Sequence, residues 1–296
     1  MADFILQGMG VALVTPFKQD KTIDFEALTR VIRHTLDGNA DFLVVLGTTG
    51  ETPTLLPEEK RIVRRHVVEQ TGGRVPLVLG VGGNCTQSVV RELSEGDFTG
   101  FDAILSVVPF YNKPSQEGLY MHYMAIAEAS PLPVILYNVP GRTGVNMTAA
   151  TTLRIAGDAK GKVIGIKEAS GKFEQIEEII KNKPDFFEVI SGDDSITYPL
   201  MTLGATGVIS VIGNAFPREF GRMVRLCLKG NFADALPIHF RFTELFNLLF
   251  VDGNPAGVKC TLSELGLIEN ELRLPLVPTR LSTNERIHSL LKDLHS

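Results

Sequence analysis

The sequence contains little cysteine, with three residues among 296. These cysteines are far apart, form no CxxC pair and have no zinc-site spacing. An odd number of separated thiols is not the framework of a small disulfide-stabilised secreted domain. We therefore expect Cys85, Cys227 and Cys260 to be reduced and mostly buried thiols in a reducing compartment.

Positive charge is not in excess, and no stripe rich in Lys and Arg runs along the chain. Lys and Arg number 29 against 34 Asp and Glu, which gives a formal net charge of −5. This balance argues against a nucleic-acid-binding protein, although a local positive site for an anionic substrate stays open. The six histidines have no HxH or HExxH spacing, so the sequence contains no zinc-protease motif.

Long apolar runs are also missing, and we expect no signal peptide. No run approaches the roughly 20 apolar residues that a membrane helix needs. The first ten residues contain Asp3 and no Lys or Arg, and so lack the positive region of a signal peptide. A hydrophobic share of 44% and a charged share of 21% exclude a mainly disordered chain. We expect a soluble cytoplasmic protein with two domain units, or one large α/β barrel with an appendage.

Short apolar runs rich in β-branched residues recur along the first three quarters of the chain. Each run is almost continuously apolar, without the alternation of a strand that has one face in water. Such strands are typical of parallel sheets, which are covered on both faces. The runs span residues 10–14, 42–46, 77–81, 103–108, 134–137, 163–167, 187–190 and 207–212.

Helical periodicity fills the segments between these runs, as in residues 25–36. Asp24 suits the N-cap of this helix, and Pro57 followed by two glutamates suits the start of the next. Eight strand–helix units predict an α/β protein of the (β/α)8 TIM barrel class. A doubly wound open sheet is the alternative. It is disfavoured because the glycine-rich residues 80–84 are followed by Cys85, where a GxGxxG motif needs its third glycine.

The pattern changes after Pro217, where helical periodicity dominates and one short strand-like run covers residues 272–277. No low-complexity linker separates this part from the rest. We therefore expect residues 1–218 to form the barrel and residues 219–296 to form a C-terminal helical domain packed on it. The helical stretches are 220–229, 232–249, 256–265 and 283–294.

Reactive groups of a parallel barrel lie at the carboxyl ends of its strands, and Lys167 stands at such an end. The apolar residues 163–166 place this lysine in a buried environment. Burial disfavours the charged ammonium, and a neutral amine is a nucleophile that forms a Schiff base with a ketone. The alternative is a structural ion pair between Lys167 and a carboxylate such as that of Glu168.

Hydroxyl groups and an arginine follow other strands. Thr48 and Thr49 lie between two glycines that allow a tight turn, and they can relay protons or bind a carboxylate. An ordinary capped turn is the alternative. Tyr137 and Tyr111 each follow a strand and are either proton-shuttle residues or packing residues. Arg142 lies in a glycine-flanked loop, where it either binds a carboxylate or is an ordinary surface arginine.

Two adjacent acids, Asp193 and Asp194, follow the apolar run 187–190. Paired carboxylates can hold a metal ion. No cluster of histidines accompanies them in the sequence, however, and Asp at the start of a helix is a preferred capping residue. We therefore favour Asp193 as a helix N-cap over a metal site.

Taken together, four ordered motifs resemble the dihydrodipicolinate synthase family, within the pyruvate-dependent class I aldolase superfamily. They are Gly-Thr-Thr-Gly-Glu at 47–51, Tyr-Asn-Lys-Pro at 111–114, Tyr-Asn-Val-Pro-Gly-Arg-Thr-Gly at 137–144 and Lys-Glu-Ala at 167–169. The resemblance covers nearly the whole chain. It implies a TIM barrel with a C-terminal helical domain. It also implies a lyase of lysine and diaminopimelate biosynthesis that condenses pyruvate with L-aspartate 4-semialdehyde to 4-hydroxy-tetrahydrodipicolinate.

The resemblance also implies roles for the residues at the strand ends. Lys167 matches the lysine that forms the Schiff base. Tyr137, Thr49 and Tyr111 match the three members of a hydroxyl relay that moves protons to and from the reacting centre. Thr48 and Thr49 match the residues that bind the carboxylate of pyruvate.

Further expectations follow from the same resemblance. Arg142 matches the arginine that receives the semialdehyde carboxylate, and the backbone carbonyl of Ile209 matches one that faces the catalytic site. In the family the tyrosine at the place of Tyr111 enters a neighbouring subunit, which implies a homodimer or a homotetramer built as a dimer of dimers. No metal or organic cofactor is expected, because the iminium formed with pyruvate is itself the electron sink. The expected partners are two small-molecule substrates, with no nucleic acid and no membrane.

Two other functions stay open from the sequence, and a metal-dependent aldolase is possible in principle. One is a sister aldolase or lyase acting on sialate, a keto-deoxy sugar acid or hydroxy-oxoglutarate. Such enzymes share the roles of Lys167 and Tyr137 but generally do not carry Arg142 in this motif. The other is a non-catalytic barrel that binds a keto acid, although binding alone does not need the lysine.

The site through which lysine inhibits many family members is not matched here. That site, at a dimer interface, commonly uses a tyrosine, an acid and one or two histidines, together with an asparagine that is present as Asn84. The other corresponding residues are Phe110, Ser88, Pro57 and Lys60. A bound cationic lysine therefore lacks its anionic partner, and the hypothesis is weak inhibition by lysine or none.

Overall fold

Eight parallel strands form a closed barrel in chain order, from β1 to β8. The structure, a computed structural model, describes residues 4–295. The barrel confirms the predicted (β/α)8 class, and it excludes the doubly wound sheet because a closed barrel has no edge strand. The strands are β1 Gly8–Ala12, β2 Phe42–Val45, β3 Leu77–Gly80, β4 Ala103–Val107, β5 Val134–Asn138, β6 Val163–Glu168, β7 Glu188–Ser191 and β8 Gly207–Ser210.

Each strand coincides with one of the apolar runs of the sequence, and nearly every strand residue is buried. The helices are α1 Phe25–Asp37, α2 Pro57–Thr71, α3 Thr86–Glu95, α4 Gln116–Ala129, α5 Pro140–Thr143, α6 Ala149–Asp158, α7 Phe173–Asn182, α8 Asp194–Thr202, α9 Pro217–Leu228, α10 Phe232–Leu248, α11 Ala256–Glu264 and α12 Leu281–His295. Short 3-10 turns, η1 Thr48–Gly50, η2 Thr52–Thr54 and η3 Ile212–Asn214, complete the chain.

The predicted helix starts are confirmed by their capping contacts. The Asp24 carboxylate accepts a hydrogen bond from the Ala27 N–H at 2.9 Å, which caps α1. Pro57 occupies the first turn of α2, where its missing N–H costs no hydrogen bond. In the same turn, the Glu59 carboxylate accepts from the N–H of Leu56 at 2.9 Å.

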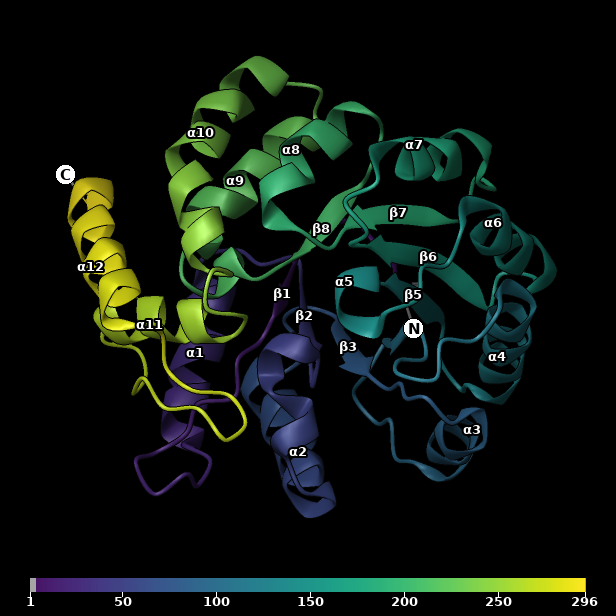
Figure 1. The fold of residues 1–296 in the computed structure, drawn as a ribbon, viewed down its shortest axis with the longest axis horizontal. Helices are drawn as coiled ribbons and strands as arrows, with labels where there is room; N and C mark the ends of the chain where they lie inside the picture. Colours follow the sequence, from purple (N-terminus) through teal and green to yellow (C-terminus); the bar gives the residue numbers. More distant parts are fainter. Residues whose placement is uncertain (1–3, 296) are drawn as a thin grey trace. The chain divides into compact units, whose positions relative to one another are not determined.

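The chain divides into two compact units. The first comprises Met1–Gly8 and Pro76–Ile209, and the second comprises Met9–Val75 and Ser210–Ser296. In the first unit, helices α3, α4, α6 and α7 succeed one another along the outer side of the strands (Figure 1). The Tyr123 side chain of α4 is fully buried, and its hydroxyl donates to the Ser106 carbonyl of β4 at 2.9 Å. Such contacts hold the helix layer against the strands that carry the site.

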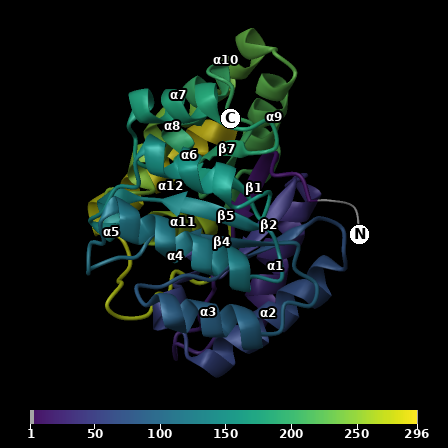
Figure 2. The ribbon, with the colours of Figure 1, turned by 90° about the vertical axis from the view of Figure 1, so that its right-hand side faces the viewer.

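The second unit contains β1, β2, α1 and α2 together with the helices that follow β8. Helices α9 and α10 lie side by side in both views (Figures 1 and 2). Their contact is built from aromatic rings, since the centroid of Phe242 lies 5.2 Å from that of Phe216 and 6.5 Å from that of Phe220. Asn214 of η3 ties this part to β1, because its Nδ2 donates to the Ala12 carbonyl at 2.8 Å.

The structure corrects one expectation in the C-terminal part. Residues 272–277 form no strand, although the run is apolar. Pro275, inside the run, explains the difference, because proline has no N–H to donate to a ladder and is confined to strand edges and starts; Pro278 follows directly after the run. The division at residue 218 between barrel and helical domain stays a prediction; residues 1–3 and 296 at its outer limits lie outside the described part.

Two general properties follow from the described residues. Among residues 4–295, no helix has both the length and the apolar character needed to cross a bilayer. The same residues contain no group of three or more His, Cys, Asp or Glu arranged to hold a metal ion. The three cysteines are unpaired, with Cys227 and Cys260 buried and Cys85 exposed, so burial is as expected for two of the three.

Candidate active site

Lys167 and Tyr137 lie next to each other at the ends of β6 and β5. They are register partners in this parallel pair, and partners on neighbouring strands point to the same face of a sheet. The Nζ atom of Lys167 lies 4.3 Å from the centroid of the Tyr137 ring. Each residue is only 6% exposed. The first unit therefore holds a nearly buried amine against a phenol at the carboxyl ends of two strands.

Glu168 does not pair with Lys167. Successive residues of a strand point to opposite faces, and the Glu168 carboxylate instead accepts from the Asn138 side chain at 3.2 and 3.3 Å. Asn138 and Glu168 are themselves register partners. An ion pair between Lys167 and Glu168, the alternative left open by the sequence, is therefore wrong. The amine faces the side of the sheet that the carboxylate does not reach.

Gly192 leaves room for the side chain of Lys167. This glycine follows β7, and its N–H donates to the Glu168 carbonyl at 2.8 Å. A Cβ atom at this position would lie 3.0 Å from Cε of Lys167 and 2.7 Å from Cβ of Ala169. Any larger residue here would displace the lysine, so the requirement is for space rather than for an unusual backbone angle.

The Thr48–Thr49 turn belongs to the second unit and follows β2. Thr48 is the first residue of η1, and Thr49 is buried. The sequence suggested that the flanking glycines make the turn possible. The left-handed residues are instead Leu46 and Glu51, with φ of 57° and 52°. Such angles are strained for residues with a Cβ and are found at functional sites, so the tight geometry is set by the residues on either side of the Gly-Thr-Thr-Gly segment.

Tyr111 and Arg142 are exposed residues of the first unit. Tyr111 lies in the loop after β4, whereas Arg142 lies in the short helix α5, where the sequence predicted a loop. Tyr111 has a left-handed backbone with φ of 73°, and its residue surface is 88% exposed. Its N–H donates to the Thr143 carbonyl at 3.4 Å, which brings it beside the short helix α5 that carries Arg142. Tyr111 is therefore not a packing residue of its own chain. Ile209, by contrast, lies buried within β8.

The comparison with known proteins decides the family. The sequence pattern of the Dihydrodipicolinate synthetase family matches residues 5–294, which is nearly the entire chain. The chain belongs to the dihydrodipicolinate synthetase family. Since this match includes the segments of Lys167, Tyr137 and the two threonines, it covers all the strand ends described above.

Relatives within this family are similar over their full length. A 4-hydroxy-tetrahydrodipicolinate synthase from Phocaeicola vulgatus is 64% identical over 98% of this chain and 97% of its own. The crystal structure of dihydrodipicolinate synthase from Aquifex aeolicus is 40% identical, covers 98% of both chains and has a TM-score of 0.94. A chloride-inhibited family member from Acinetobacter baumannii, complexed with pyruvate, is 38% identical over 98% and 99% of the two chains, with a TM-score of 0.94.

The residues that fix the Thr48–Thr49 turn in place were not predicted from the sequence. Asn254, at the start of the segment leading into α11, donates from Nδ2 to the Thr49 hydroxyl at 3.0 Å. Lys259 of α11 forms an ion pair with Glu51, and both residues are fully buried. Burial lowers the pKa of Lys259 to about 8, against the opposing charge of Glu51. A lysine inside the apolar stretch 256–262 was the available signal, since buried lysines are paired.

Asp193 behaves as the sequence predicted. Its carboxylate accepts from the Ser195 N–H at 2.9 Å and from the Ser195 hydroxyl at 2.7 Å, which caps α8. The N-cap interpretation is confirmed, and both capping hydrogen bonds go to Oδ1 of Asp193. Asp194, the first residue of α8, is buried.

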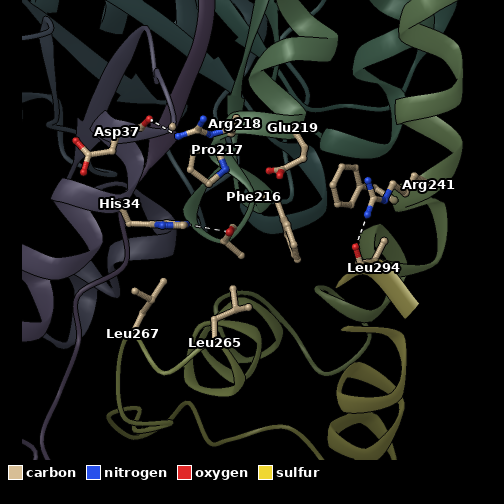
Figure 3. Close-up of a pocket in the computed structure, with 13 residues that line it drawn as sticks. His34, Asp37, Phe216, Pro217, Arg218, Glu219, Arg241, Leu265, Leu267 and Leu294 are labelled. Carbon is tan, nitrogen blue, oxygen red and sulfur yellow. Dashed lines mark hydrogen bonds between the residues drawn. The ribbon is translucent and has the colours of Figure 1, made fainter. Parts of the chain in front are cut away.

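A cavity of about 340 Å³ lies in the second unit (Figure 3). Its polar side includes His34, which bonds the Ala215 carbonyl at 3.0 Å, and Arg218, which donates to the Asp37 carbonyl at 3.3 Å. Leu265 and Leu267 lie across from this side, and Leu294 of α12 lies beside Arg241, which donates to its carbonyl. No candidate catalytic residue lines it, so it has no part in the chemistry considered below.

Proposed function

We propose that this chain condenses pyruvate with L-aspartate 4-semialdehyde to 4-hydroxy-tetrahydrodipicolinate through a Schiff base on Lys167. The observation that carries the proposal is the nearly buried Lys167 amine, held 4.3 Å from the centroid of the Tyr137 ring and not paired with the adjacent Glu168. The activity named for the Phocaeicola vulgatus relative, and the pyruvate bound to the Acinetobacter baumannii relative, support it.

The first half of the reaction activates pyruvate. The amine of Lys167 attacks the ketone carbon, and loss of water leaves an iminium. The iminium withdraws electrons from the adjacent methyl group, which loses a proton and becomes an enamine. Tyr137 is the proposed proton carrier, because its phenol lies beside the reacting nitrogen. Thr48 and Thr49 are the proposed ligands of the pyruvate carboxylate, and Thr49 also joins the relay.

The second half forms the carbon–carbon bond and closes the ring. The enamine carbon attacks the aldehyde carbon of the semialdehyde, whose carboxylate the exposed Arg142 receives. The amine of the semialdehyde then attacks the iminium carbon, and Lys167 leaves as a free amine. The carbonyl of Ile209 is proposed to face this centre. The iminium serves as the electron sink, so the proposal requires neither a metal nor an organic cofactor.

We also propose that the active form is a homodimer or a dimer of dimers. Tyr111 supports this proposal, because it is 88% exposed and held by a strained left-handed backbone. A second copy of the chain is the proposed recipient of this ring, which then acts as the third hydroxyl of the relay. The unpaired cysteines accord with a cytoplasmic location, and weak or absent inhibition by lysine stays a prediction.

A sister aldolase acting on sugar aldehydes is the second candidate, and the two are separated by substrate. The test supplies pyruvate to the purified protein together with L-aspartate 4-semialdehyde or with a series of sugar aldehydes, with and without a metal chelator. We expect condensation with the semialdehyde, no turnover of the sugars and no effect of the chelator. A preference for a sugar aldehyde would contradict the proposed substrate, and loss of activity with the chelator would contradict the Schiff-base mechanism.

A further inference from the structure

A buried polar pair lies directly behind the two reactive residues. Asn138 follows Tyr137 on β5, Glu168 follows Lys167 on β6, and the two are register partners. Both residues are fully buried. The Asn138 amide donates to Oε2 of Glu168 at 3.2 Å and to Oε1 at 3.3 Å. The pair therefore ties together the last residues of the two strands that present the phenol and the amine.

The contacts continue from this pair into a network of side chains and backbone groups. The Ser170 N–H donates to Oε1 of Glu168 at 2.8 Å, and Nε2 of Gln175 on α7 donates to Oε2 at 3.3 Å. The Met147 N–H donates to Oδ1 of Asn138 at 3.0 Å. We call these groups, together with Asn146 and the Asn138 amide, the Glu168 network.

One branch of the network reaches the segment that carries Arg142. The Asn146 amide donates to Oε1 of Gln175 at 2.8 Å, and its Oδ1 accepts from Asn138 at 3.0 Å. The segment between β5 and α6 is thereby fixed at its far end, four residues beyond Arg142. The network therefore touches three site elements: the ends of β5 and β6 and the loop between β5 and α6.

The chemistry of the network is not that of a stabilising ion pair. Its hydrogen-bond donors to Glu168 are neutral amides and the Ser170 hydroxyl, and burial raises the pKa of the Glu168 carboxyl while these hydrogen bonds oppose the shift. Taking a carboxylate out of water is unfavourable, and apolar residues of similar volume are often as stabilising as a buried polar group. What such a network supplies is a fixed geometry, since every member restricts the position of another.

We propose that Glu168 is a positioning residue, which through this network fixes Lys167 against Tyr137 and fixes the loop of Arg142. The inference rests on the proposed function, in which these three residues touch the substrates. Because Lys167 and Glu168 are adjacent, a rotation of the end of β6 that releases the carboxylate also turns the amine away from the phenol. Misplacement of reacting groups by about 1 Å can cost about a hundredfold in rate.

The test measures the two half-reactions separately in Glu168→Gln. Glutamine has the shape of glutamate, but one of its two acceptor oxygens becomes a donor. In either orientation of the new side-chain amide, its NH2 group faces the Asn138 NH2 group. It also faces a second donor, either the Ser170 N–H or the Gln175 amide. We expect the rate of borohydride-trapped imine formation at saturating pyruvate to fall about tenfold or more. The half-saturating pyruvate concentration should stay within about twofold, because its proposed carboxylate ligands, Thr48 and Thr49, are outside the network.

Asn146→Ala isolates the branch toward Arg142. It should leave imine formation within about twofold of the wild-type rate and lower kcat/KM for the semialdehyde about tenfold. Glu188→Gln is the matched control, because Glu188 lies at the start of β7, in register with Gly165 and not with Glu168. Its carboxylate accepts from the Thr206 hydroxyl at 3.0 Å and has no contact with the network. Imine formation should stay at the wild-type rate in this variant.

Several outcomes would overturn the proposal. In one, folded Glu168→Gln forms the imine at a rate within about twofold of wild type. In another, Glu168→Gln and Glu188→Gln lose the same factor in the rate of imine formation. If Glu168→Gln does not fold, Gln175→Leu decides, because it removes one donor to Glu168 from a half-buried helix residue. A threefold or larger slowing of imine formation supports the proposal, and a smaller effect contradicts it. A wild-type protein that traps no pyruvate refutes the proposed function itself.

Discussion

Replacing Lys259 with methionine tests how firmly α11 holds the threonine turn. Lys259 and Glu51 form an ion pair in which both side chains are fully buried. The Lys259 ammonium also donates to the Glu271 carbonyl at 2.8 Å and lies 4.2 Å from the centroid of the Phe17 ring. Methionine keeps the apolar volume but leaves the Glu51 carboxylate buried without its cation. Removing one partner of a buried pair costs about 3–5 kcal/mol, so we expect a loss of that size in the free energy of unfolding.

The assay is urea unfolding of the wild-type protein and matched variants, followed by circular dichroism. Arg286→Met is the control, because Arg286 pairs with Glu244 at the surface, where the side chains are 55% and 41% exposed. Its loss should stay below about 1 kcal/mol. The double variant Glu51→Leu/Lys259→Met buries no charge and should recover most of the loss. If Lys259→Met lowers the free energy of unfolding no more than Arg286→Met does, the buried pair is not as important for stability as expected.

Three further predictions concern pH and the site. Burial lowers the pKa of His122 from 6.5 to about 4, so the unfolded chain binds this proton first. Stability is then lost as the pH falls from 6.5 toward 4. The free energy of unfolding in urea should fall by about 2–3 kcal/mol between pH 7 and pH 4.5, and His122→Gln should abolish this fall. The same pH dependence in His122→Gln as in wild type would contradict the prediction. Gly192→Ala places a methyl group 3.0 Å from Cε of Lys167, and borohydride trapping should slow about tenfold; a wild-type trapping rate would show that the space is not needed. Arg142→Ala should lower kcat/KM for the semialdehyde at least tenfold while imine formation stays near wild type; equal losses in both steps would instead assign Arg142 to holding its loop.

The strands and helix starts were predictable because they depend on local chemistry. The apolar run around Lys167 predicted a buried strand, and Asp24 and Asp193 predicted helix starts, since short acidic side chains bond the free N–H groups there. The run 272–277 misled because hydrophobicity alone does not decide a strand. Pro275 within it removes an N–H group that a ladder needs.

The support behind the site was not predictable in the same way. Glu51 and Lys259 form an ion pair although more than two hundred residues separate them in the sequence, and no local sequence pattern predicts such a pairing. From the sequence, Glu168 is a candidate ion-pair partner of Lys167, although the alternation of side chains along a strand directs the two to opposite faces of the sheet. In the turn after β2 the glycines were the predicted flexible positions, but the left-handed angles fall on Leu46 and Glu51, which no residue-type preference indicates.

Reduction with borohydride in the presence of pyruvate tests the central claim most directly. The treated protein is digested, and the modified peptide is located by mass spectrometry, with Lys167→Ala treated in parallel. We expect a pyruvyl adduct on Lys167, at the end of β6 beside Tyr137, and no adduct in the variant. A folded wild-type protein without an adduct, or with the adduct on another lysine, would contradict it.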